Sequence, residues 1–510
     1  MNTQRPEWND ANNALVGNGT SMVTLCYLHR FMKFFQDLLD RSEFENVKIS
    51  SELLEFYHSI REGLQEFEVL VEKGIDDEQR KVVLDRFGKS ASDYRQQIYS
   101  SGFWGKKRSA SLGGLKTFAK YSLLFLEHTI RENQRKDKLF HAYNIITVGK
   151  SVISCNRLDE MLEGQVAVLS SGLLNSKESL EVLDALKASK LFRSDQYSYI
   201  LYPNKDLPGF LQKNIISKDD VASSELITKL VKNGNTQIVE MDINGDFHFS
   251  GNFKNANDLA IALDLLPNKY SNLVEAEREL ILEIFEKVFN HKAFTGRSGT
   301  FFSYEGLGSI YWHMVSKLHL AVQECCLKAT YENEDPKIIG QLYDHYYEIG
   351  AGIGVHKSPE LYGAFPTDPY SHTPQHRGAQ QPGMTGQVKE DILVRFGELG
   401  VFVNKGKIFF NPSLLRKVEF TTESKIFEYF DLRNEYQKLQ IKPRMLAFTY
   451  CQVPVIYQLA NERAIAIEYN VGKTVFINSH QLDKEISQEI FNRTGAVKKI
   501  IVSIPESITK

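Results

Sequence analysis

The chain has 510 residues, with 61 Lys plus Arg against 64 Asp plus Glu, and 42% of its residues are hydrophobic. This composition predicts about three globular domains, or one large domain with a smaller one. A formal net charge of −3 argues against a dedicated nucleic-acid binder, which needs a basic surplus to displace counterions from phosphates. No apolar run reaches the roughly 20 residues that span a bilayer, and no secretory signal is visible. The five cysteines show no CxxC spacing, so we expect reduced thiols and a cytoplasmic protein.

Amphipathic helices are predicted through the first third of the chain. Leu25, Leu28 and Met32 recur at spacings of three and four residues, which places them on one helical stripe. The same periodicity continues over residues 50–72, 78–99 and 115–133. Successive helices joined by short loops typically form antiparallel hairpins.

The middle of the chain has a mixed pattern. Further helices are predicted over residues 158–173, 176–188, 275–290, 307–330 and 336–349. Short strands are predicted over residues 198–202, 236–242 and 246–250, and the last two are joined by an Asn244-Gly245 hairpin turn. We therefore expect a mixed α/β insertion around residues 190–255 within a helical region.

The sequence pattern changes twice after residue 349. Residues 350–383 are rich in Gly, Pro, His and Tyr without periodicity, and their aromatic content favours a functional loop over disorder. After residue 400, short β-branched and aromatic runs predict strands of an antiparallel β-sandwich. These runs are residues 401–403, 407–410, 417–421, 444–450, 453–459, 464–469, 473–477 and 499–502. The predicted domains are therefore 1–400 and 401–510.

The first candidate site lies near the N-terminus, where Trp8 and Asp10 stand two residues apart just before the first predicted helix. Desolvation beside an indole raises the pKa of a carboxyl group, as a general acid requires. The alternative interpretation is an exposed tail with an Asn helix cap. The spacing alone leaves both open.

The second candidate is an anion site in and after the aperiodic segment. Its predicted donors are His372, His376, Arg377, Thr385 and Gly386. They precede a helix predicted to begin near residue 387, whose free amide groups favour an anion. A metal site is disfavoured, because Pro374 prevents the two histidines from sharing a helix face.

The remaining candidate site residues lie in two other segments. Glu390 falls in the first turn of the predicted helix, where it is either a general base or an acid that complements the helix dipole. Arg297, Tyr304 and Glu305 lie in a Gly- and Ser-rich segment that lets the backbone approach a ligand closely. A helix-to-helix turn with aromatic anchors explains that segment equally well. The predicted substrate-binding set is Trp8, Arg297, Tyr304, Glu305, Tyr370 and Gln381.

These segments together resemble the cellobiose phosphorylase-like enzymes of the six-hairpin glycosidase superfamily. Trp8-Asn9-Asp10 matches the catalytic Trp-Asn-Asp motif of that family, so the resemblance implies that Asp10 is the general acid. Thr385-Gly386 resembles the family's phosphate-binding Thr-Gly pair, and His372 or His376 matches its phosphate-binding histidine. The implied fold is an (α/α)6 barrel followed by a C-terminal antiparallel β-sandwich.

The chain departs from the family pattern in two ways. Asp10 lies almost at the N-terminus, whereas the family's motif follows several helices, so a homodimer or a missing N-terminal half is expected to complete the barrel. In addition, Glu390 follows the Thr-Gly pair closely. An inverting hydrolase needs a second carboxylate roughly 6.5–9.5 Å from the acid, whereas a phosphorylase does not.

The prediction is an inverting carbohydrate-active enzyme that cleaves a β-glucosidic bond in an oligosaccharide by phosphorolysis. Inorganic phosphate is the expected co-substrate, with no other cofactor, no metal, and no nucleic-acid or membrane partner. The alternatives are an inverting hydrolase with Glu390 as base, and a catalytically silent sugar-binding fragment or subunit of a split enzyme.

Overall fold

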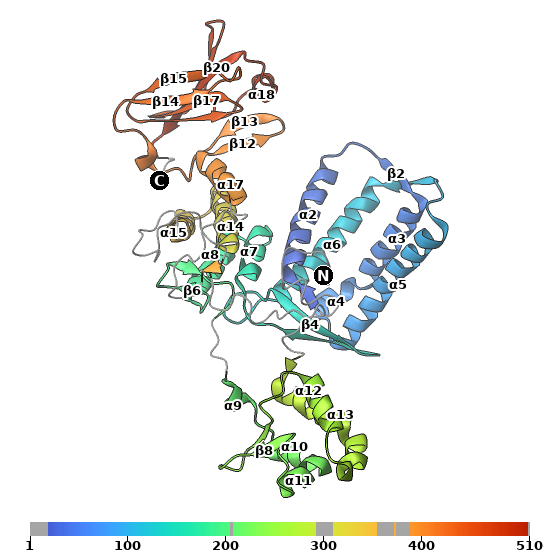
Figure 1. Cartoon of the computed structure of the whole chain (residues 1–510). Coiled ribbons are helices and arrows are strands. Elements are labelled where there is room, and N and C mark those ends of the chain that lie inside the picture. Colours follow the sequence, from blue (N-terminus) through green and yellow to red (C-terminus); the bar gives the residue numbers. More distant parts are fainter. Residues whose placement is uncertain (1–18, 204–207, 292–309, 354–371, 374–387, 508–510) are drawn as a thin grey trace.

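The computed structural model describes residues 19–203, 208–291, 310–353, 372–373 and 388–507 (Figure 1). Up to residue 399 the described chain is mainly helical, and from residue 401 it is mainly strands. The sequence-based expectation of helices followed by a C-terminal β region is therefore confirmed. None of the helices in the described part is long and apolar enough to cross a membrane.

Four helices from distant parts of the chain lie side by side as successive neighbours. They are α2 (Met22–Asp40), α7 (Leu162–Ser170), α14 (Trp312–Tyr331) and α17 (Val388–Leu399). Val23 at the start of α2 and Met161 before α7 share a small cluster around Tyr143. Further along, Arg30 Nη1 of α2 donates to the carbonyl of Ser170 (3.1 Å) at the end of α7. Helices α2 and α7 therefore run parallel.

The other two helices of this row have the same direction. The Sγ atom of Cys325, in the second half of α14, donates to the carbonyl of Leu169 (3.8 Å) near the end of α7. Lys317, in the first half of α14, is close enough to Glu390 at the start of α17 to lower its pKa, and further along α14 Gln323 Nε2 donates to the carbonyl of Val394 (2.7 Å) in α17. The starts of α2, α7, α14 and α17 consequently lie at one end of the row.

Helices of the opposite direction lie against this row. They are α6 (Leu112–Glu132), which packs on α2, α8 (Ser176–Ala188), which packs on α7 and α14, and α15 (Pro336–Gly352), which packs on α14 and α8. Lys116 Nζ of α6 pairs with Asp40 at the end of α2 (3.1 Å), as expected for antiparallel neighbours. In a further layer, α3 (Ser51–Glu66) and α4 (Glu68–Lys73) pack on α6, and α5 (Asp77–Ser101) packs on α3. The described helices form an open row that begins at α2 and ends at α17, and the predicted closed barrel is not shown.

Short strands connect these helices, and most were absent from the sequence-based prediction. The pairs and the triplet are β2 (Asn46–Ser50) with β3 (Lys107–Ser111), β1 (Gly19–Ser21) with β4 (Tyr143–Val148) and β5 (Ile153–Arg157), β6 (Phe192–Arg193) with β7 (Ser198–Tyr199), and β10 (Ile310–Tyr311) with β11 (His372–Thr373). Most are only two to five residues long, which is too short for an alternating pattern to be recognised.

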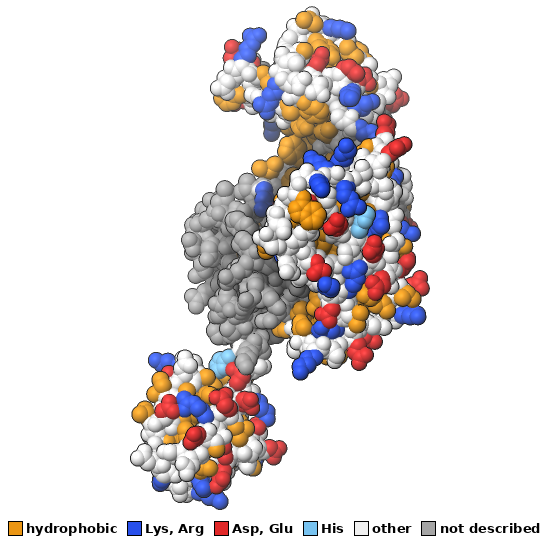
Figure 2. Space-filling model, turned by 90° about the vertical axis from the view of Figure 1, so that its right-hand side faces the viewer, with side chains coloured by type: hydrophobic (Ala, Val, Ile, Leu, Met, Phe, Trp, Pro, Cys, Tyr) orange, Lys and Arg blue, Asp and Glu red, His pale blue; other side chains and the backbone are white. Residues whose placement is uncertain are grey.

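Residues 208–291 form a small body with its own core. Its elements are α9 (Phe210–Lys213), α10 (Lys218–Ser223), α11 (Glu225–Lys232), β8 (Val239–Met241), β9 (Phe247–Phe249), α12 (Ala256–Asp264), η1 (Asn268–Tyr270) and α13 (Ser271–Phe289). Leu226, Phe249 and Phe285 are buried in this core. The predicted hairpin turn is confirmed, because Gly245 has φ 86° and joins β8 to β9. Figures 1 and 2 show this body at the bottom, set apart from the other helices.

The C-terminal region contains a five-stranded sheet with the order β16-β17-β20-β18-β19. Its strands are β16 (Met445–Tyr450), β17 (Val453–Ala460), β18 (Ala464–Tyr469), β19 (Thr474–Ile477) and β20 (Val497–Pro505). Hairpins β12 (Val401–Asn404) with β13 (Lys407–Phe410) and β14 (Lys425–Phe430) with β15 (Tyr436–Ile441) precede it.

Two details of the predicted sandwich are wrong. Strands β17 and β20 pair in parallel, because α18 (Lys484–Phe491) separates β19 from β20 and allows the chain to re-enter the sheet in the direction of β17. The strand predicted over 417–421 instead contains the short helix η4 (Lys417–Glu419), after which the Phe420 side chain is buried in the core.

Candidate active site

Two of the predicted site residues fall in the described part of the chain, Glu390 and His372. The others lie outside the described residues, so the structure neither brings them together nor separates them. They are Trp8, Asp10, Arg297, Tyr304, Glu305, Tyr370, His376, Arg377, Gln381, Thr385 and Gly386.

The segments that carry those residues join the described chain at one end of the helical row. Segment 1–18 leads through β1 into α2, segment 292–309 leads through β10 into α14, and segment 374–387 leads directly into α17. All three helices have their starts at the same end of the row. The described structure thus supplies three attachment points at one end for the predicted site residues.

Glu390 is a buried carboxyl group in the first turn of α17. It is 5% exposed, because residues 390, 394 and 397 share the helix face that packs on α14. Its Oε2 atom is buried and has no hydrogen-bond partner among the described residues, and the exposed Lys389 Nζ lies 3.8 Å from Oε1. Desolvation raises the pKa of Glu390, although Lys389 and Lys317 act to lower it. Such a group differs from the usual solvent-exposed acid of a helix start and is suited to hold or transfer a proton.

The position of α17, and therefore of Glu390, is fixed by hydrogen bonds to α14 and α15. The Tyr346 hydroxyl of α15 donates to Glu398 Oε1 (2.7 Å), and Arg395 Nη1 donates to Glu398 Oε2 (2.7 Å). Arg395 also pairs with Glu419 of η4 (2.8 Å). Burial and the charge of Glu398 raise the pKa of Tyr346, so its hydroxyl remains a donor. This network joins the end of α17 to both neighbouring helices and to the C-terminal region.

The backbone of His372 lies beside the start of α14. His372 pairs with Tyr311 and Thr373 pairs with Ile310 in the antiparallel β10–β11 pair. Because β10 leads directly into α14, the backbone of this predicted phosphate ligand lies at the end of the row where the helix starts gather.

A second buried carboxyl group, Glu163, was missed by the sequence-based analysis. It lies in the first turn of α7, is 5% exposed, and its Oε2 accepts a hydrogen bond from the Tyr143 hydroxyl (2.8 Å). Burial and the charge of Glu163 raise the pKa of Tyr143 well above its usual value. The sequence did contain a signal for this residue, because Glu163 is the one charged residue in the apolar run of α7, whose residues 162–169 are all buried.

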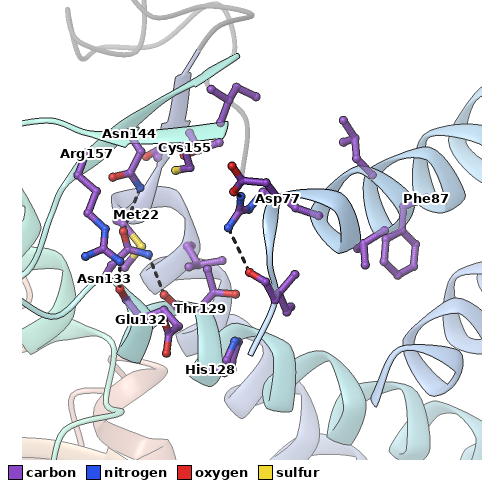
Figure 3. A pocket seen from close by; sticks show the side chains of 18 residues that line it. Met22, Asp77, Phe87, His128, Thr129, Glu132, Asn133, Asn144, Cys155 and Arg157 are labelled. Atoms are coloured by element: carbon purple, nitrogen blue, oxygen red, sulfur yellow. Dashed lines mark hydrogen bonds and ion pairs between the residues drawn. The ribbon is translucent and has the colours of Figure 1, made fainter. Parts of the chain in front are cut away.

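A cavity of about 470 Å³ lies beyond the start of α2, between α5, α6 and the β4–β5 strands (Figure 3). Arg157 donates to the carbonyl of Glu132 (2.7 Å) at its edge, and Asn144 Nδ2 donates to Asn133 Oδ1 (2.9 Å). Glu390, the predicted site residue whose side chain lies in the described part of the chain, is not among its lining residues. Among the described residues, no group of three or more His, Cys, Asp or Glu side chains is arranged to hold a metal ion.

Comparison with protein families gives a match to part of the chain. The family model of GH149 phosphorylase insertion domain 2 matches residues 207–292, which corresponds to the small body formed by α9 to α13. A search of curated proteins finds no match. The chain is therefore related, through this segment, to a family of carbohydrate phosphorylases.

Proposed function

We propose that this protein is an inverting phosphorylase that cleaves a β-glucosidic bond in an oligosaccharide. The observation that carries the proposal is the match of residues 207–292 to an insertion domain of GH149 phosphorylases. The resemblance of Trp8-Asn9-Asp10 and Thr385-Gly386 to the motifs of cellobiose phosphorylase-like enzymes supports the finer assignment. We place the enzyme in the cytoplasm, in keeping with five free cysteines.

In the proposed reaction, Asp10 protonates the glycosidic oxygen of the leaving sugar. Inorganic phosphate attacks the anomeric carbon from the opposite face, which inverts its configuration. The proposed phosphate ligands are His372, His376, Arg377, Thr385 and Gly386. Their sequence position directly before α17 supports this role, because the amide groups of a helix start favour an anion.

The sugar is proposed to contact the aromatic and hydrogen-bonding side chains of the same segments. These are Trp8, Arg297, Tyr304, Glu305, Tyr370 and Gln381. An aromatic ring presents an apolar face to a sugar ring, while Arg and Glu bond its hydroxyl groups. The common attachment of their segments at one end of the helical row supports a shared site.

Hydrolysis with Glu390 as general base is the second candidate. The burial of Glu390, its unpartnered Oε2 and its raised pKa favour this alternative, because a general base works best with a pKa near the working pH. A hydrolase would use this carboxylate to activate water in place of phosphate.

The test is an incubation of the purified chain with β-linked glucose oligosaccharides, with and without inorganic phosphate. Sugar 1-phosphate and free sugar are followed separately. We expect phosphate-dependent formation of sugar 1-phosphate, which Asp10→Asn reduces by at least about 100-fold because the leaving oxygen is no longer protonated. Free sugar released without phosphate would instead favour hydrolysis, and neither product would favour the silent subunit.

Glu390→Gln distinguishes the two reactions. Phosphorolysis is expected to stay within about twofold of the wild-type rate, whereas hydrolysis is expected to fall at least about 100-fold. Asp391→Asn, at the exposed neighbouring position, is the matched control. A loss of phosphorolysis in the Gln variant alone would contradict a purely structural role for Glu390 in the phosphorylase.

A further inference from the structure

A second cavity, of about 350 Å³, lies at the end of α7, away from the helix starts that gather at the proposed active site. It is lined by residues of α2, α7, α8 and α14 and of the loop that joins α7 to α8. We call it the α8 pocket, because α8 begins at its wall. Its volume falls within the roughly 300–1,000 Å³ of cavities that bind small molecules.

The carbonyl oxygens at the end of α7 already have hydrogen-bond donors. Arg30 Nη1 of α2 donates to the carbonyl of Ser170 (3.1 Å). Lys328 Nζ of α14 donates to the carbonyls of Gly172 (3.3 Å) and Leu174 (2.8 Å) in the following loop. These acceptors therefore need no donor from a ligand.

The donors around the α8 pocket are only partly used. Arg30 uses three of its five N–H groups, two on Glu324 and one on Ser170, and Lys328 uses two of its three. Ser176 is 2% exposed, and its buried Oγ atom has no hydrogen-bond partner among the described residues. A buried hydroxyl without a partner costs free energy, which a ligand with acceptor atoms would recover.

Ser176 is also the first residue of α8, a helix of 13 residues. The side chain of Asn175 caps this helix by accepting from the backbone N–H of Glu178 (2.8 Å). The N–H groups of Ser176 and Lys177 precede that position, and no carbonyl within the helix can reach them. The start of α8 thus adds backbone donors and the positive end of a helix dipole, both of which favour an anion.

The side chains that line the α8 pocket carry a net charge of +2, from Arg30, Lys33 and Lys328 against Glu324. Arg30 neutralises Glu324 through two hydrogen bonds of 2.7 and 2.8 Å, which leaves the two lysines without a carboxylate inside the pocket. A phosphate group matches this arrangement better than a carboxylate does, because it carries up to two negative charges and has more acceptor oxygens.

We propose that the α8 pocket binds a phosphate group, either as inorganic phosphate or as part of a sugar 1-phosphate. The phosphate oxygens accept from Ser176 Oγ and from the first amides of α8, while Lys33 and Lys328 balance the charge. The α8 pocket is separate from the phosphate ligands proposed before α17, since the two lie at opposite ends of α7. Binding here does not depend on the proposed reaction.

The test is hydrogen–deuterium exchange of the full chain, read by mass spectrometry, with inorganic phosphate, glucose 1-phosphate or glucose. We expect both phosphates to slow the exchange of amides over residues 172–179, and glucose to have no effect there. Tighter binding of glucose 1-phosphate would identify a sugar phosphate as the ligand, whereas equal binding would show that the phosphate group alone is recognised.

Two variants test the residues of the α8 pocket. Ser176→Ala removes a hydroxyl that bonds nothing in the described chain, so the fold is expected to be kept while the dissociation constant rises about tenfold. Lys33→Glu, at an exposed position, replaces an attractive charge by a repulsive one and is expected to raise the constant at least about tenfold. Circular dichroism checks that each variant is folded.

The matched control is Lys218→Glu, which makes the same change of charge at an exposed lysine in the first turn of α10, outside the α8 pocket. It is expected to leave the dissociation constant unchanged. Three results would overturn the proposal: no slowing over residues 172–179 at millimolar phosphate, equal slowing by glucose, or slowing that persists in both Ser176→Ala and Lys33→Glu. Slowing confined to residues 388–399 would support the proposed active site and also exclude the α8 pocket.

Discussion

The first turns of α7 and α17 place a buried glutamate at the same end of the helical row, but in different surroundings. Glu163 and Glu390 are both 5% exposed. Glu163 accepts a hydrogen bond from Tyr143, whereas Oε2 of Glu390 has no hydrogen-bond partner in the described part of the chain, and desolvation raises the pKa of Glu390. A buried carboxylate that accepts a side-chain hydrogen bond stabilises the fold, while one with an unpartnered oxygen is costly to keep charged and is available for chemistry. Equal burial therefore has opposite consequences in the two helices.

Removal of the partner of Glu163 is the strongest test of this contrast. Tyr143→Phe takes away the hydroxyl that binds the buried carboxylate, and we expect a loss of about 2 kcal/mol in stability. Thermal melting followed by circular dichroism should show a lower melting temperature for the helical region. Tyr99→Phe, at an exposed position, is the matched control and should melt like the wild type. An unchanged melting temperature in Tyr143→Phe would show that the bond contributes little.

Removal of the charge of Glu390 should change the stability by less than Tyr143→Phe does, and in the opposite direction. Its folded-state pKa lies above the usual 4.5, so folding favours the protonated carboxyl. The stability that this proton contributes is present below pH 4.5 and is lost as the pH rises through the folded-state pKa. Glu390→Gln is therefore expected to become more stable than the wild type as the pH rises above 4.5.

The melting temperatures of both proteins from pH 4 to pH 8 check this expectation. Asp391→Asn, at an exposed position in the same turn, is the control for a change of charge at the helix start. A difference between Glu390→Gln and wild type that does not vary with pH would refute the raised pKa.

The smallest effect is expected in the network that holds α17. Tyr346→Phe removes the hydrogen bond to Glu398, but Arg395 still pairs with that carboxylate. We expect a loss of about 1 kcal/mol, measured as a small decrease in melting temperature. Tyr331→Phe, whose ring is exposed, is the control. A larger loss of stability than that of Tyr143→Phe would contradict the expected order of the two effects.

Local sequence patterns predicted much of the fold. The helix expected over residues 176–188 is α8 (Ser176–Ala188), and the helix expected near residue 387 begins at Val388. In both cases periodic apolar residues and a polar start favour the same structure. The short strand β1 was missed, because it is held by pairing with β4, more than 100 residues further along the chain.

For the candidate site, the residue types could be predicted from the sequence, whereas their arrangement depends on contacts between distant segments. Glu390 was predicted in the first turn of a helix, and this position is confirmed. Its burial against α14 was not predictable, because spacing within one helix does not identify the neighbouring helix. The roles of Asp10 and of the phosphate ligands stay predictions, since these residues other than His372 lie outside the described chain.

The sequence by itself determined which segments are helical, since the 3.6-residue period and the capping residues act within a few turns. It also determined that α2 has two apolar faces, because both follow from spacing alone. Only the tertiary structure decided that α2, α7, α14 and α17 are parallel neighbours and that Tyr27, Phe31, Phe34 and Leu38 of α2 are exposed. It also decided that Glu163 accepts a hydrogen bond from Tyr143, while Oε2 of Glu390 has no hydrogen-bond partner among the described residues. These properties depend on contacts between segments far apart in the chain, and no local pattern specifies such contacts.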